Sequence, residues 1–135
     1  MADVPVPLMA KNLRRFVIVV NLVYAAVLLC LGVIPDLPEV AVDIPDFAAH
    51  GLAYAAHTVL LYALLLPSFG RGNATIFAFT GAVLYGGIVE ALQFLQPVRT
   101  VEMRDLLANA IGAVVAATIL YLVTGRERQA ATDEQ

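Results

Sequence analysis

Long apolar runs constrain this chain more than any other feature of its sequence. The first, residues 16–34, holds about 19 residues with Asn21 as its only strongly polar member, close to the roughly 20 that a helix needs to cross the hydrocarbon of a bilayer. Runs of similar length follow at 47–66, 74–95 and 105–123. Because backbone polar groups in hydrocarbon must be satisfied within the segment, each run is expected to be a helix.

Composition supports an integral membrane protein. Hydrophobic residues make up 61% of the chain and charged residues 14%, whereas a soluble domain is about half apolar and a quarter charged. The sequence predicts an all-α membrane protein, a bundle of four transmembrane helices in a single domain over residues 1–135. The basic residues form no stripe with interleaved aromatics, so no nucleic-acid partner is expected. The single cysteine, Cys30, excludes a disulfide within the chain.

The segments between the runs carry helix boundaries. Pro35 should end the first helix, because proline disfavours helix in the residue before it. That first run also follows basic residues, as a signal peptide would, but it is longer than the usual h-region and no small-x-small cleavage site follows it. Asp46 is expected to be the N-cap of the second helix. Residues 67–73 are expected to be a turn and residues 96–104 a loop.

Basic residues predict the orientation, because lysine and arginine in short flanks accumulate on the cytoplasmic side. Arg99 and Arg104 flank one membrane face. Both termini and the 67–73 turn flank the other, more basic face and are expected to be cytoplasmic. The basic residues on that face are Lys11, Arg14, Arg15, Arg71, Arg126 and Arg128.

Polar residues lie at helical spacing in three of the apolar runs. Residues three and four apart share one face of a helix. In and just before the second helix, four polar residues are separated by four, four and three positions, and similar spacing recurs in the third and fourth helices. The stripes are Asp46, His50, Tyr54 and His57; Glu90 and Gln93; and Asp105, Asn109 and Gly112.

Topology and depth should bring these stripes together. Four antiparallel spans place the start of the second helix, the end of the third and the start of the fourth on one membrane face. At about 1.5 Å rise per residue, His50, Glu90 and Asn109 lie about 6–8 Å from those helix ends, and Arg99 lies over them in the loop. Small residues that would let the helices approach are Gly81, Gly86, Gly87, Gly112, Ala49, Ala53 and Ala56.

Two segments resemble the signatures of the VanZ-like family of small bacterial membrane proteins. D-F-A-A-H-G-L-A-Y (Asp46–Tyr54) is similar to the family's D-K-x-x-H-F-x-x-Y opening motif. E-A-L-Q-F-L-Q-P-V-R (Glu90–Arg99), followed by D-L-L-A-N-A-I-G (Asp105–Gly112), resembles its second signature: an acid, then Q, P-x-R and D-x-x-x-N-x-x-G. The resemblance covers residues 16–123.

The resemblance implies a location more than a reaction. It implies a multi-pass protein of the bacterial inner membrane and cell envelope, in a family linked to resistance to the glycopeptide antibiotic teicoplanin. It carries over no established enzyme activity. Phe47 stands where the family usually has lysine, and Gly51 replaces a usual aromatic. The resemblance therefore does not support a role that needs that lysine, such as binding a phosphate.

The catalytic candidates are Glu90, His50 and Asp105, and each has a structural alternative. Glu90 would act as a general base, or its carboxylate would pair with an arginine or Asn109 and hold two helices in register. His50 would carry a proton or bind a ligand, because imidazole titrates near neutrality, or it would be hydrogen-bonded within the bundle. His57 lies deeper and is expected to be a packed histidine.

A divalent metal is a further alternative at this site. Asp46, His50, Glu90 and Asp105 combine carboxylates with imidazole, which suits Zn or Mn. No compact ligand motif such as H-E-x-x-H is present, so the sequence favours a site without metal or another cofactor. Asp105 would alternatively cap the fourth helix.

Arg99 is the best candidate for holding an anionic head group, because guanidinium grips phosphate or carboxylate in a bidentate manner. Its structural alternative is an ion pair with Glu102 or an acid of the 35–46 loop. The leading hypothesis is recognition of an envelope lipid or glycolipid head group in an outward-facing polar pocket. The ligand-binding candidates are Asp46, His50, Tyr54, Glu90, Gln93, Arg99, Asp105 and Asn109.

Two other functions fit the same residues. The first is a membrane enzyme that acts on a lipid phosphate or glycan linkage, with Glu90 or His50 as acid or base and Arg99 stabilising charge. The second is a structural subunit of a membrane complex, in which the polar cluster only locks the fold. The expected partners are membrane lipids or a lipid-linked envelope intermediate, with a second copy of the chain or another membrane protein as further options.

Overall fold

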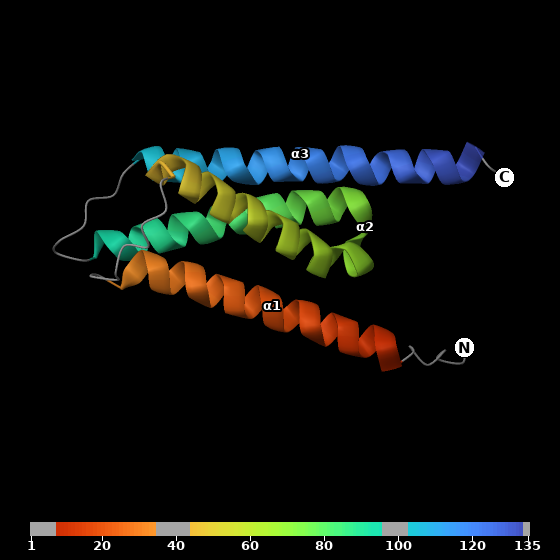
Figure 1. Cartoon of the computed structure of the whole chain (residues 1–135), viewed down its shortest axis with the longest axis horizontal. Coiled ribbons are helices and arrows are strands. Elements are labelled where there is room, and N and C mark those ends of the chain that lie inside the picture. The colour runs from red at the N-terminus through yellow and green to blue at the C-terminus, as the bar shows by residue number, and fades with distance from the viewer. Residues whose placement is uncertain (1–7, 35–43, 96–102, 134–135) are drawn as a thin grey trace.

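Three long helices make up the described part of the protein (Figure 1). The computed structural model describes residues 8–34, 44–95 and 103–133, and no strand is present in these ranges. The helices are α1 (Leu8–Val33), α2 (Asp46–Phe94) and α3 (Met103–Asp133). Each contains a segment long and apolar enough to cross a membrane by length and composition: Lys11–Val33, Asp46–Gln93 and Met103–Gly125.

The predicted count of four helices is not confirmed, because residues 46–94 form one element, α2, in which two helical segments meet directly at Gly70. Pro67 is accommodated inside α2, and the only non-helical backbone angles within it are at Gly70, with φ 68° and ψ 168°. Glycine has no Cβ and therefore adopts this region without steric cost. The chain reverses at this single residue, so that α2 forms a first arm, residues 46–69, and a second arm, residues 71–94, that run in opposite directions (Figure 1).

Contacts between the two arms confirm their antiparallel arrangement. A Cβ at Gly86 would lie 3.0 Å from the ring of Tyr54. One turn further along the first arm, the rings of His57 and Tyr85 lie 5.0 Å apart in an edge-to-face arrangement. Each arm of 24 residues is about 36 Å long, which exceeds the roughly 30 Å of bilayer hydrocarbon.

Helix α1 packs against α2 and, within the described residues, not against α3. Side chains in both helices donate hydrogen bonds to backbone carbonyl oxygens of the other, so the contact is polar as well as apolar. Such bonds compensate for the lack of a hydrophobic driving force between helices in lipid. The donors and acceptors are Asn21 to Leu60, Tyr24 to Ala53, Tyr85 to Ala25, and Gln93 to Gly32.

Helix α3 packs against α2 through small residues. A Cβ at Gly112 would overlap the backbone of Gly51, so the two helices touch there through their main chains. Further along, Tyr62 donates a hydrogen bond of 3.1 Å to Thr124. The prediction that small residues permit close approach is confirmed at Gly112. The buried alanines of α3 are Ala108, Ala113, Ala116 and Ala117.

The two ends of the bundle differ in character. The start of α1, the reversal in α2 and the end of α3 lie at one end (Figure 1). At that end Arg71 stacks on the ring of Tyr121, with 4.5 Å from its Cζ to the ring centroid. The starts of α2 and α3 lie at the opposite end. The cytoplasmic orientation of the termini stays a prediction, and the 35–43 and 96–102 segments lie outside the described residues.

Candidate polar site at the starts of α2 and α3

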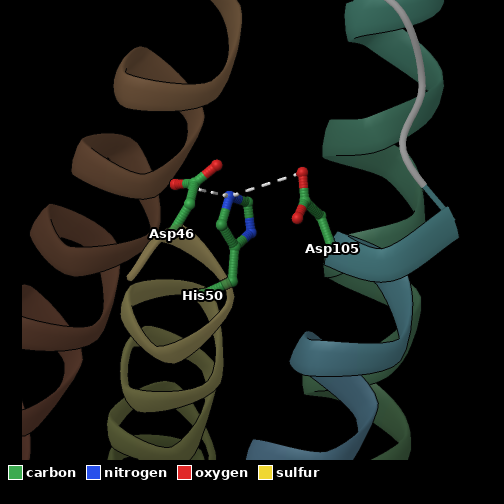
Figure 2. A group of neighbouring side chains, drawn as sticks. All are labelled: Asp46, His50 and Asp105. Carbon is green, nitrogen blue, oxygen red and sulfur yellow. Dashed lines mark ion pairs between the residues drawn. The ribbon is translucent and has the colours of Figure 1, made fainter. Parts of the chain in front are cut away.

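Three of the predicted site residues meet where α2 and α3 begin. His50 points between the carboxylates of Asp46 and Asp105 (Figure 2). Its Nε2 atom lies 4.0 Å from Oδ1 of Asp46, one turn earlier in α2, and 3.9 Å from Oδ2 of Asp105 in α3. Because Asp105 is far away in sequence, the packing of α3 on α2 creates this group.

The other nitrogen of the His50 ring, Nδ1, has a hydrogen-bond partner in α3. Nδ1 of His50 lies 3.2 Å from Oδ1 of Asn109, one turn beyond Asp105 in α3. With the amide oxygen as acceptor, the imidazole donates through Nδ1–H. Asn109 therefore fixes the orientation of the ring, and Nε2 faces the two carboxylates.

Burial is graded across these four side chains. The Asp46 side chain is 85% exposed, whereas the side chains of His50 and Asp105 are 27% and 17% exposed. Asn109 is only 1% exposed. We call the exposed end of the group, at Asp46, its mouth and the enclosed end, at Asn109, its floor.

The buried floor extends to the second arm of α2. A Cβ at Gly86 would lie 3.0 Å from Cε1 of Tyr54 and 3.2 Å from Nδ2 of Asn109, so both side chains rest on this glycine. Glu90 follows Gly86 by one turn and is 4% exposed. Residues four apart share a helix face, which places Glu90 on the stripe that faces Tyr54.

Two other predicted site residues are placed differently. Gln93 is buried, but its Nε2 atom donates a hydrogen bond of 2.9 Å to the carbonyl oxygen of Gly32 in α1. Its observed role is therefore to attach α1 to α2. Arg99, the expected anion-binding residue, lies outside the described residues, and so does Glu102.

The two capping predictions do not agree with the helix starts. Asp46 was expected to be the N-cap of its helix, but Pro45 occupies that position and no side-chain cap hydrogen bond is made. Asp105 is the third residue of α3, which begins at Met103. Prolines before Asp46 signalled a helix start, but sequence could not fix it to one residue. Capping thus does not account for the Asp46 carboxylate.

His57 lies deeper, as expected, in an enclosure of tyrosine rings that the sequence did not reveal. Its ring centroid is 5.0 Å from that of Tyr85, 5.9 Å from Tyr24 and 6.2 Å from Tyr54. The only sequence signal for this enclosure was the spacing of Tyr54 and His57 on one stripe. Tyr24 and Tyr85 come from other parts of the chain and could be placed only by the packing.

The fold and site define an all-α membrane protein with a polar group set near one end of apolar helices. Large apolar side chains are exposed along all three helices, a distribution that membrane lipid, and not water, would solvate. The model of the VanZ/LLP1 family matches residues 11–124. The chain belongs to this family. Comparison with curated proteins and with solved structures returns no match.

The family match agrees with the resemblance of the two sequence signatures. Both signatures lie within the matched range, and they supply the residues of the polar group: Asp46 and His50 from the first, Asp105 and Asn109 from the second. The departure at Phe47 affects the mouth, since this side chain is exposed where the family usually has lysine. The described part of the mouth therefore presents two carboxylates and an imidazole.

Proposed function

We propose that this protein recognises the head group of an envelope lipid or glycolipid at the polar group formed by His50, Asp105 and Asn109. The observation that carries the proposal is the burial gradient from an accessible mouth to an enclosed floor. Polar residues within apolar helices are costly and are usually functional. We infer that the starts of α2 and α3 lie near the level of the lipid head groups, because each helix contains a segment long and apolar enough to cross a membrane.

The chemistry of the described residues favours polar, hydroxyl-rich or amine-bearing groups. Carboxylates accept hydrogen bonds from sugar hydroxyls and amines, and Nε2 of a neutral imidazole protonated at Nδ1 is a further acceptor. An acidic part of the head group would be held by Arg99, as the sequence suggests. A glycolipid intermediate offers both kinds of group, and the family's link with glycopeptide resistance is consistent with an envelope ligand.

Lipid analysis of the purified protein tests this proposal. We expect a specific envelope lipid to co-purify with the wild-type chain in mild detergent, and to be lost from Arg99→Ala and from Asp105→Asn. Glu127→Gln is a matched control, because it removes a carboxylate at the far end of α3. If the lipids bound to all four proteins are the same, the proposal is wrong.

One observation favours an enzyme as the second candidate. With Nδ1–H donated to Asn109, the Nε2 atom of His50 is presented at the mouth, where a histidine can act as a general base. The substrate would carry a lipid phosphate or glycan linkage. Turnover of a labelled polyprenyl phosphate or glycolipid by the purified protein, abolished in His50→Ala and retained in Glu127→Gln, would establish this alternative.

A further inference from the structure

We propose that Asp46, His50 and Asp105 form a binding site for one divalent transition-metal ion, Zn²⁺ or Mn²⁺. Each residue offers one ligand atom, and these three atoms lie within 4.8 Å of one another. Asp46 and His50 lie in the first two turns of α2, and Asp105 lies in the first turn of α3 (Figure 2). The site therefore exists only in the folded bundle.

The separations fit an ion placed between the side chains. In a tetrahedral zinc site with bonds of about 2.1 Å, ligand atoms lie about 3.4 Å apart. The observed separations from His50 Nε2 are 4.0 Å to Asp46 and 3.9 Å to Asp105. Each of these two pairs therefore has to close by about half an ångström, and the two aspartate oxygens, which lie within 4.8 Å of each other, by up to about 1.4 Å. The exposed Asp46 side chain is free to make most of that movement.

A direct hydrogen bond does not explain these distances. Charge-assisted hydrogen bonds between nitrogen and a carboxylate are about 2.7–2.9 Å long. The two distances from Nε2 of His50 to the carboxylates are about 1 Å longer. In the neutral tautomer that donates Nδ1–H to Asn109, the lone pair of Nε2 faces two carboxylates. Lone pairs and negative charges repel one another, and a cation between them turns this repulsion into attraction.

Asn109 supplies the support that a metal-binding histidine needs. Ligating histidines almost always donate their other ring N–H to a carbonyl, carboxylate or water, which fixes the tautomer and raises the basicity of the ligand atom. Here the acceptor is the amide oxygen of a side chain that is 1% exposed. This support is independent of the two carboxylates, because it comes from the opposite side of the ring.

Other roles for the two aspartates leave their geometry unexplained. Asp46 does not cap α2. Asp105 forms an ion pair with His50 at 3.9 Å, which is longer than a direct hydrogen bond. Both residues lie in the first turn of their helices, where the helix dipole attracts negative charge.

Bound metal would also change what the site attracts. Three protein ligands leave a coordination position open toward the mouth, for a water or an oxygen of a substrate. If a lipid head group binds here, as proposed above, a phosphate oxygen could take this position and the ion would offset the two carboxylate charges. This consequence depends on lipid recognition, whereas the metal site itself does not.

Titration with metal alone tests the site. The full-length chain, in detergent micelles with its purification tag removed and stripped by a chelator, is titrated with ZnCl₂ and separately with MnCl₂ in a calorimeter. We expect one equivalent of at least one ion to bind. His50→Gln and Asp105→Asn should each weaken that binding at least tenfold, while Glu127→Gln should leave it unchanged.

Two variants of Asn109 separate orientation of the imidazole from general stability. Asn109→Ala should weaken metal binding about 10–100-fold, the range seen when a supporting hydrogen bond to a ligand is lost. Asn109→Asp still accepts the bond from Nδ1–H and should retain the affinity. Circular dichroism shows whether each variant keeps its helices. Absence of stoichiometric binding to the wild type, or equal binding by His50→Gln and Asp105→Asn, would overturn the proposal.

Discussion

Gly112 of α3 lies against the backbone of Gly51 in α2, so closely that a Cβ atom at position 112 would overlap the Gly51 carbonyl group. This contact lies one turn beyond Asn109 in α3 and one residue beyond His50 in α2. It therefore sets the distance across which the imidazole reaches the α3 side chains. The close approach of the two main chains is a precondition for the polar site.

Gly112→Ala should destabilise the protein and disrupt the site together. Overpacking of a tight contact costs about 1–3 kcal/mol, and moving α3 outward would separate His50 from Asn109. Thermal unfolding in detergent measures the first effect. Gly87→Ala is the matched control, because nothing lies within 4 Å of a Cβ there; it should leave stability unchanged or raise it by up to about 1 kcal/mol. Equal melting temperatures for the two variants would contradict the close packing.

The reversal of α2 makes a second prediction. Gly70 has a φ of 68° and a ψ of 168°, in a region that is essentially restricted to glycine and costs other residues about 1–3 kcal/mol. Gly70→Ala should therefore lower the free energy of unfolding by about that amount. Gly72→Ala offers an equally exposed comparison without positive φ and should be neutral or stabilising. A Gly70→Ala variant as stable as Gly72→Ala would argue against a reversal at this residue.

The bond between His50 and Asn109 can be measured by a double-mutant cycle. Interhelical hydrogen bonds in membrane proteins contribute about 0.6 kcal/mol on average. We expect a coupling energy of about that size from His50→Ala, Asn109→Ala and the double variant. Thermal or chemical unfolding supplies the four stabilities. Strict additivity would mean that the two side chains do not interact in the folded protein.

Tyrosine hydroxyls should anchor α1 to α2. Tyr24 donates to Ala53 in α2, and Tyr85 of α2 donates to Ala25 in α1. Replacing either with phenylalanine removes one such bond and should cost about 0.6 kcal/mol, while the two changes together should increase cleavage of the chain by protease after α1. Tyr121→Phe is the comparison, since its ring stacks on Arg71 and this stacking survives the change. If the double variant is cleaved at the same rate as the wild type, these hydrogen bonds do not stabilise the packing of α1 on α2.

Much of the site could be predicted from the sequence, because helical spacing alone orders side chains along a face. Spacing identified the stripe from Asp46 to Tyr54 and the pair Asp105 and Asn109. The packing of α3 on α2 brings His50 of the first together with both residues of the second. Contacts that depend on how the helices pack could not be predicted in this way. Gln93 shares a stripe with Glu90, yet it bonds to Gly32 of α1, a contact that no spacing within one helix encodes.

The helix count shows a second limit. Pro67, Gly70 and Gly72 predicted a turn of several residues, because proline and glycine are the residues that most often interrupt helices. The protein instead confines the reversal to Gly70 and continues the helix on both sides. Local sequence thus indicated where the chain reverses but not how few residues it needs. The tyrosine enclosure of His57 was equally inaccessible, because two of its three rings lie elsewhere in the chain.

Native mass spectrometry of the protein released from micelles tests head-group recognition most directly. The wild-type chain should retain one envelope lipid as a discrete mass increase, and Glu127→Gln should retain it equally. The variant with both His50→Gln and Asp105→Asn should lose that increase while it keeps the helical content of the wild type. Retention of the same lipid in equal amount by a folded double variant would contradict recognition at this site.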